Sequence, residues 1–337
     1  MIGLLARRTA SLVLVLIGVS IITFTISHVI PGNPAAAAAG SNASPEQIAA
    51  VNKRLGLDKP LPEQYVIYVK RLLHGDFGES IVSAGPVSAD FTARLPASSE
   101  LALAAILLYI PLGIGLGVLS ARAPGRWADA GSRVFAVLGV SVPVFWLALV
   151  AQLVFSGHWH WLPSTGRLGA GVAPPPHVTG FFTIDAILAG QWSTLGDALR
   201  HLVMPAVVLA VTNLAVLARM TRSSMLEVIG QDYIRTARAK GVSELRLLTR
   251  HALKNALIPV VTVIAVQMAG LIAWQFLVEY VYSWPGIGSW AVTGITNSDF
   301  NVVMMVALFG ATLYVVLNFL ADAAYIVLDP RIRDATE

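Results

Sequence analysis

The chain has 337 residues, of which 56% are hydrophobic and only 12% are charged. Soluble domains are about a quarter charged, so this composition excludes an ordinary soluble globular protein and indicates a membrane protein. The absence of cysteine excludes disulfides and thiolate chemistry, and the net charge of +4 does not indicate nucleic acid binding, because the basic residues gather between apolar segments.

Six apolar runs are close to the roughly 20 residues that a helix needs to cross a bilayer core. They are residues 9–31, 98–121, 134–156, 202–218, 258–282 and 301–325. The sequence therefore predicts an all-α membrane protein with six transmembrane helices. We divide it into an N-terminal transmembrane helix over residues 1–31, an extracytoplasmic helical segment over 32–96 and a transmembrane core over 97–337.

The first run follows Arg7 and Arg8, and the stretch Ala35–Ala39 behind it could pass for a signal-peptide cleavage region. A signal peptide has an apolar region of roughly 7 to 15 residues, and this run is longer. We therefore expect an uncleaved first helix whose amino end lies in the cytoplasm.

The segment over residues 32–96 contains two predicted helices. In Ser44-Pro45-Glu46-Gln47, a serine N-cap, a first-turn proline and a glutamine able to close a capping box predict a helix that runs toward Gly56. A second helix is expected after the break at Lys59-Pro60-Leu61-Pro62.

The second and third apolar runs each carry a packing signal. Gly113 and Gly117 form a small-xxx-small pair, which favours a close approach between helices. Pro143, near the start of the third run, predicts a kink.

The Gly- and Pro-rich segment between residues 157 and 201 holds His158-Trp159-His160-Trp161. The two histidines would point to different faces of a helix, and no carboxylate or cysteine is close in sequence, so we favour an interfacial aromatic belt formed by Trp159 and Trp161 over a metal site.

Residues 219–257 are a long, strongly basic interruption between apolar runs. Residues 232–240 predict a short helix that stops at Gly241. A second helix is predicted from Glu244, and on it Arg246, Arg250 and Lys254 form one basic face before Pro259 opens the fifth span. Such helices can lie on anionic lipid or pass a partner's movement into the bilayer, and the residue pattern alone leaves both interpretations open.

The fifth span ends in Glu279-Tyr280-Val281-Tyr282-Ser283-Trp284-Pro285-Gly286-Ile287-Gly288. This segment is either an outer turn with an anchoring tryptophan or part of a gate, and we expect a positive φ at Gly286. Most Lys and Arg residues fall on the side of the central basic segment, so both termini are predicted to be cytoplasmic.

Arg235-Thr236-Ala237 with Gly241, followed by Arg250-His251-Ala252-Leu253-Lys254-Asn255-Ala256-Leu257-Ile258-Pro259, resembles the coupling loop of ABC importer permeases. The general motif has Glu at position 235, and the departures at 235, 236, 251 and 254 resemble the dipeptide and oligopeptide branch. Trp161-Leu162-Pro163-Ser164 and the segment around Pro285 also resemble this branch, so the likeness covers nearly the whole chain.

The resemblance implies a type I ABC importer permease fold in the cytoplasmic membrane of a bacterium, with alternating access as the mechanism. It implies a second homologous permease subunit, two cytoplasmic ATPase subunits that bind ATP and Mg, and an extracytoplasmic substrate-binding protein, with no cofactor in this chain. The residues expected to contact the ATPase are Tyr233, Arg235, Thr236, Ala237, Arg238, Lys240 and Gly241. Ala237 and Gly241, four residues apart, are expected to form the face of closest approach, and Glu279, Trp284, Pro285 and Gly286 are the expected gate residues.

The sequence has no Gly-x-x-x-x-Gly-Lys-Ser/Thr loop, so the chain is not expected to bind ATP itself or to be an enzyme. Peptides are the expected substrate, and import of nickel or glutathione is the alternative within the family. An ion-coupled secondary transporter is the alternative from another class, for which the spans offer mainly Gln267, Gln275 and Asn318.

Overall fold

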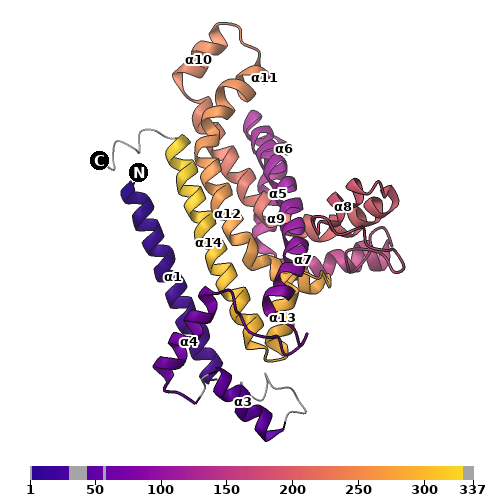
Figure 1. Cartoon of the computed structure of the whole chain (residues 1–337). Coiled ribbons are helices and arrows are strands. Elements are labelled where there is room, and N and C mark those ends of the chain that lie inside the picture. Colours follow the sequence, from indigo (N-terminus) through magenta and orange to yellow (C-terminus); the bar gives the residue numbers. More distant parts are fainter. Residues whose placement is uncertain (1, 30–43, 56–57, 329–337) are drawn as a thin grey trace. The chain divides into compact units, whose positions relative to one another are not determined.

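The computed structural model describes residues 2–29, 44–55 and 58–328. Among these residues the regular elements are helices, accompanied by one isolated β-bridge between Glu79 and Pro86. The elements, labelled in part in Figure 1, are α1 (Ile2–Val29), α3 (Pro45–Leu55), α4 (Leu61–Leu73), α5 (Val87–Arg122), α6 (Trp127–Ser141), α7 (Val144–Ala151), the π-helical η1 (Gln152–His158), α8 (Phe182–Leu188), α9 (Trp192–Ile229), α10 (Asp232–Ala239), α11 (Glu244–Arg246), the π-helical η2 (Leu247–Ala252), α12 (Leu253–Val281), α13 (Ile287–Thr296) and α14 (Phe300–Leu328). The prediction of an all-α fold is confirmed.

Four helical stretches in the described part of the chain are long and apolar enough to cross a membrane. They are Val87–Arg122, Trp192–Ile229, Glu244–Leu271 and Phe300–Leu320. A fifth results if Asp129–Ser141 and Val144–His158, which meet at 104°, form one bent span. The predicted first span is represented by the shorter apolar stretch Val13–Thr25, while residues 30–31, 35–39 and 329–337 lie outside the described residues.

Three predicted boundaries differ from the observed helices. The second span starts at Val87, within the segment predicted as extracytoplasmic, because residues 87–97 continue the same helix. The fourth begins at Trp192 and contains Pro205. The predicted helix from Glu244 is continuous with the fifth span, so Pro259 lies inside α12 instead of opening the span.

The chain divides into two compact units, and the first contains residues up to Ser98 together with Pro285–Val315. The loop that precedes α5 is held by Asp299, which is fully buried and accepts hydrogen bonds from the Ser80 hydroxyl and the Ile81 amide, both at 2.7 Å. The predicted capping box is confirmed at α3, where the Ser44 amide donates to Gln47 Oε1 (2.8 Å) and the Gln47 amide donates to Ser44 Oγ (3.3 Å).

The second unit contains Ser99–Trp284 and the residues from Val316 onward, with α9 in its core. The predicted close packing at the glycines of α5 is confirmed. A Cβ atom at Gly113 would lie 3.0 Å from the Leu217 side chain on α9, and one at Gly117 would overlap Thr221. A Cβ atom at Gly139 on α6 would likewise lie 2.8 Å from the Ala215 side chain of α9.

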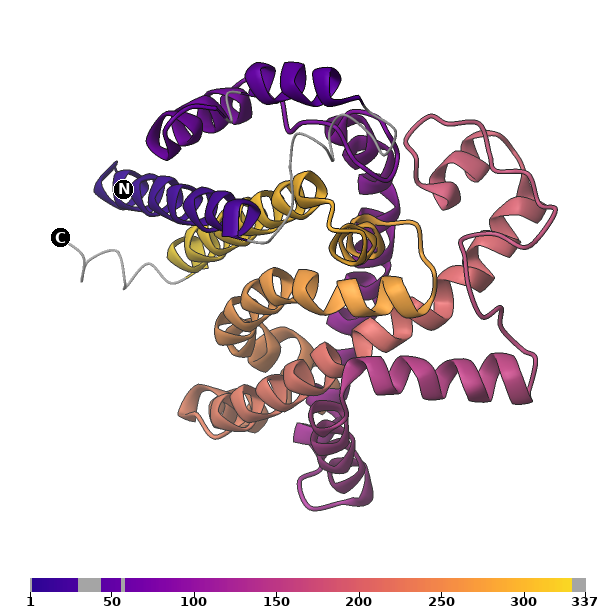
Figure 2. The same ribbon diagram turned by 90° about the horizontal axis from the view of Figure 1, so that it is seen from below.

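The predicted kink at Pro143 is also confirmed, as a break between α6 and α7. Val142 and Pro143 have extended backbone angles, and Val144 begins the next helix. The change of direction can be followed in Figure 2. It arises because proline disfavours the helical conformation in the residue before it and cannot donate a helical hydrogen bond.

Candidate functional site

The predicted coupling helix is present as α10, which covers Asp232–Ala239. Asp232 places a negative charge in its first turn, where the helix dipole favours it. At the other end Gly241 has a φ of +79°, a left-handed conformation that an L side chain rarely adopts. The sequence-predicted stop at this glycine is therefore confirmed.

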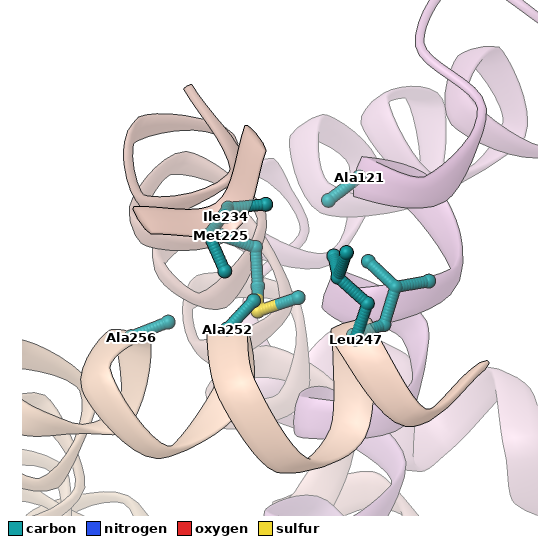
Figure 3. Packing of buried hydrophobic residues seen from close by; sticks show 7 residues of the cluster. Ala121, Met225, Ile234, Leu247, Ala252 and Ala256 are labelled. Atoms are coloured by element: carbon teal, nitrogen blue, oxygen red, sulfur yellow. The ribbon is translucent and has the colours of Figure 1, made fainter. Parts of the chain in front are cut away.

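A buried apolar cluster fixes α10 to the ends of the neighbouring helices (Figure 3). Ile234 of α10 is fully buried, and so are Leu247 and Ala252 in η2 and Met225 near the end of α9. The remaining members are Ala121, Leu248 and Ala256. The cluster joins α5, α9, α10, η2 and α12, so α10 is packed against the ends of three of the helices that are long enough to span a membrane.

The two residues expected to form the face of closest approach differ in their surroundings, and their contact with an ATPase stays a prediction. Gly241 is exposed. Ala237 is half-buried and packs against the apolar cluster, so its methyl group is turned toward the chain itself. The outward face opposite Ile234 is formed by Asp232, Thr236 and Ala239, with Arg235 on its flank, and all four are exposed. Ala239 was not among the predicted contact residues because its orientation depends on which side of α10 is buried.

Polar contacts stiffen the rest of this segment. Arg238 Nε donates to Glu244 Oε1 at 2.6 Å, and this hydrogen bond raises the pKa of Arg238. Asn255 Nδ2 donates to the Tyr233 hydroxyl at 2.6 Å. Lys240 is exposed, whereas Tyr233 and Arg238 form hydrogen bonds within the chain.

The basic residues of the second predicted helix lie on the continuous rod formed by α11, η2 and α12. Arg246, Arg250 and Lys254 are all exposed. The π-helical turn η2 adds a residue to one turn, and it places Leu247 and Leu248 together on the buried side while Leu245 is exposed.

The residues predicted for a gate fall in two different units. In the second unit Glu279 is fully buried and its Oε1 accepts a hydrogen bond from Gln275 Nε2 at 2.7 Å, while Trp284 is also buried. In the first unit Pro285 is exposed and Gly286 precedes α13.

The expected positive φ at Gly286 is wrong. Gly286 has a φ of −102° and a ψ of −172°, so it is extended, and the left-handed residue of this turn is Ser283 with a φ of 48°. Valine at position 286 would therefore not be strained by the backbone angle, and the argument for a gating role from that angle falls away.

Sequence reasoning missed a buried ionic cluster in the Gly- and Pro-rich segment between η1 and α9. Arg167 donates to Glu100 Oε2 at 2.6 Å and to the Gly180 carbonyl at 2.9 Å, and its guanidinium lies 3.6 Å from the centre of the Phe182 ring. Burial lowers the pKa of Arg167, although Glu100 opposes the shift. The two partners are 67 residues apart, and no local pattern marks them as a pair.

Asp185 holds the same segment through its carboxylate. Burial raises its pKa, but hydrogen bonds from Thr179, Gly180 and Val178 outweigh burial and hold the pKa below its usual value. Thr183 donates to Glu100 Oε1 through both its amide (2.8 Å) and its hydroxyl (2.6 Å). Segment 178–185 is thereby tied to α5.

His158 and His160 are not part of a metal-binding group. Among the described residues, no group of three or more His, Cys, Asp or Glu side chains could hold an ion. Trp159 and Trp161 stack with ring centres 4.4 Å apart, and both are exposed. Exposed indole rings of this kind suit an interfacial belt.

Comparison with known proteins decides between the classes of transporter. Residues 113–334 match the family described as "Binding-protein-dependent transport system inner membrane component", and residues 1–114 match the amino-terminal region of such components. The chain belongs to this family of permeases. This permease is thus a multi-pass inner membrane protein and a transport subunit without enzymatic activity of its own, as predicted.

Its relatives match along almost the whole length. The permease is 45% identical over 330 residues to a probable D,D-dipeptide transport system permease of Escherichia coli, covering 98% of this chain and 97% of the relative. It is 42% identical to a dipeptide transport system permease of Alkalihalophilus pseudofirmus, covering 97% and 98%. It is 41% identical to the dipeptide transport system permease of Escherichia coli, covering 99% of each chain.

Proposed function

We propose that this permease is one membrane-spanning subunit of an ATP-driven importer that moves dipeptides or short oligopeptides across the cytoplasmic membrane. Support comes from similarity over nearly the full length to several permeases that are named for dipeptide transport. The substrate class rests on these names.

The proposed assembly contains a second homologous permease, two cytoplasmic ATPase subunits that bind ATP and Mg, and an extracytoplasmic binding protein. The permease crosses the bilayer six times, with both termini in the cytoplasm and the segment after α1 outside. The basic residues around α10 support this orientation, because inward-facing loops are enriched in Lys and Arg.

The observation that carries the mechanism is an exposed short helix on a buried apolar base. α10 presents Thr236 and Ala239 outward, while Ile234 anchors it to α5, α9 and α12 through the apolar cluster. Amphipathic helices bind partner proteins in grooves in this manner. When the ATPases close on ATP, they draw α10 with them, and the cluster carries that movement into the spans, which alternate between inward and outward access.

The experiment that tests this proposal places bulk on the outward face of α10. Ala239→Trp is expected to lower peptide uptake by reconstituted complexes about tenfold or more, and to abolish the stimulation of ATP hydrolysis by the loaded binding protein, because the indole keeps the helix out of its groove. The thermal midpoint of the permease should be unchanged, since Ala239 is exposed.

Arg246→Gln is the matched control, since Arg246 is exposed on the adjoining rod and outside α10. Its uptake is expected to stay close to that of the wild type. Wild-type uptake and coupling in the Ala239→Trp complex would contradict docking through α10 and would favour a segment that merely lies on the membrane.

A further inference from the structure

The Asp129 carboxylate, in the first turn of α6, joins several parts of the second unit at one point. Its side chain is 1% exposed. The Ser120 hydroxyl of α5 donates to Oδ1 at 2.6 Å, and the Gly125 amide of the loop between α5 and α6 donates to Oδ2 at 2.9 Å. Arg222 of α9 donates through Nε to Oδ1 at 2.5 Å and through Nη2 to Oδ2 at 3.0 Å. We call these four residues the Asp129 joint, because α5, α6 and α9 meet there.

The hydrogen bonds of the Asp129 joint require a carboxylate. Each oxygen of Asp129 accepts two of them, one of which comes from the Arg222 guanidinium. Such a bidentate contact fixes the orientation of two side chains as well as their distance, and charge makes its hydrogen bonds stronger than neutral ones. An asparagine of the same shape has one acceptor oxygen and an amide group that only donates, so it cannot accept this set.

A second cation lies near the joint on the exposed side of α6. Arg133, one turn further along α6, has its Nη2 3.8 Å from Asp129 Oδ2, and its side chain is 59% exposed. Exposed ion pairs contribute little because water competes for both charges. Arg222 is therefore the cation that fastens α6 to α9, and Arg133 offers a matched control.

The Asp129 joint adjoins the apolar cluster on which α10 rests. Ser120 precedes Ala121, and Arg222 lies three residues before Met225, and both Ala121 and Met225 belong to the cluster (Figure 3). Among the residues that the structure describes, the cluster has no member from α6. The close approach of α6 to α9 at Gly139 lies ten residues, or about 15 Å, further along the helix. At the end of α6 nearest the cluster, the Asp129 joint therefore connects α6 with the base of α10.

The course of α6 and α7 shows what this connection can transmit. After the break at Pro143 the chain turns by 104° into α7. There the Ala148 carbonyl accepts a hydrogen bond at 3.2 Å from the hydroxyl of Tyr282, the residue that follows α12. α6 and α7 therefore form a second path, besides α12 itself, from the base of α10 to the other end of α12.

We propose that Asp129 is a positioning residue for coupling, which fastens α6 to the base of α10 so that both move as one body when the ATPases close. The inference rests on the proposed function, in which ATPase subunits dock on α10. It adds α6 to the helices that the apolar cluster joins to α10. A contact that only stabilised the fold would leave the coupling of ATP hydrolysis to transport unchanged in the assembled permease.

The first test measures whether α6 and the base of α10 move together. Spin labels are placed at Val134→Cys on α6 and Ser243→Cys beside α10, which are both exposed positions, in a complex whose other subunits lack cysteine. Pulsed electron paramagnetic resonance gives the distance between the labels without nucleotide and with ATP and vanadate. Otherwise wild-type complexes are expected to keep this distance to within about 2 Å, the size of a small helix shift, whereas Asp129→Asn should let it change by more. A larger change without the Asp129 substitution would overturn the inference.

The second test measures transport in reconstituted complexes. Asp129→Asn is expected to lower the number of peptides imported per ATP hydrolysed about fivefold or more, with the amount of assembled complex measured separately. Arg222→Lys keeps the positive charge but loses the bidentate contact, so it should lower the same ratio, and it replaces Asp129→Asn if that variant does not assemble. Arg133→Gln is the matched control and should keep the wild-type ratio.

A wild-type ratio in Asp129→Asn or Arg222→Lys would overturn the inference and leave the proposed function intact. An equal loss in Arg133→Gln would also overturn it, since a general effect of charge would then explain the result. A wild-type complex that imports no peptide would contradict the proposed function instead. The label distances need only ATP and would still decide whether α6 moves with α10.

Discussion

At the scale of single residues, the buried pair of Arg167 and Glu100 joins the segment between η1 and α9 to α5. Both side chains are less than 10% exposed, and Thr183 completes the hydrogen bonds to the carboxylate. Removing one partner of a buried ion pair leaves the other charge without compensation, which costs far more than the pair contributes when intact.

We expect Arg167→Leu to lower the free energy of unfolding by about 3 to 5 kcal/mol, because the Glu100 carboxylate would stay buried without its cation. Arg167→Leu combined with Glu100→Leu should recover part of this loss. The measurement is the thermal or denaturant midpoint of the purified complex. Costs that simply add in the double variant would show that the two residues do not act as a pair.

At the scale of elements, α9 organises the second unit because α5 and α6 meet it at glycines. Gly117 faces Thr221 and the Ala218 carbonyl, and Gly113 faces Leu217. Without side chains at these points the helix backbones approach closely, and packing replaces the hydrophobic driving force that is missing between helices in lipid. The same approach brings Ala121, near the end of α5, to the apolar cluster beneath α10.

Gly117→Ala is expected to destabilise the permease by about 1 to 3 kcal/mol, because the added methyl group would overlap Thr221 and force α5 away from α9. Gly115→Ala is the control, since nothing lies within 4 Å of a Cβ atom at that position on the same helix. It should be neutral or slightly stabilising. Thermal midpoints and the yield of assembled complex report both effects, and equal loss in the two variants would refute the packing argument.

At the scale of the whole molecule, topology decides which surfaces meet the binding protein and which meet the ATPases. Ser164, in the segment between η1 and α9, and Ser243, beside α10, are both exposed. The proposed orientation places them on opposite sides of the membrane.

Ser164→Cys is expected to react with an impermeant thiol reagent added to intact cells, whereas Ser243→Cys should react only after the membrane is opened. The chain has no other cysteine, so each signal comes from one site. Labelling of Ser243→Cys in intact cells, with protection of Ser164→Cys, would reverse the orientation of the chain and remove α10 from the ATPases.

Local signals in the sequence determined much of the secondary structure. The capping box of Ser44 and Gln47, the helix stop at Gly241 and the kink at Pro143 were all predictable, because each depends on residues within one turn of the feature. Long apolar runs likewise predicted where spanning helices lie, since the bilayer imposes a length and a composition on every span. The family was identifiable because its motifs are short and each can be read from consecutive residues.

Only the tertiary structure decided which faces of these helices are buried. Ile234 anchors α10 and Ala237 turns inward because η2 and α9 pack against that side of the helix. The residue pattern of α10 does not reveal which of its sides these elements cover. The pairings of Arg167 with Glu100 and of Arg222 with Asp129 depend on chain segments 67 and 93 residues apart. The extended backbone of Gly286 goes with its position as the N-cap residue of α13. Amphipathic patterns specify that a face is buried, but the partner that buries it is set by the path of the whole chain.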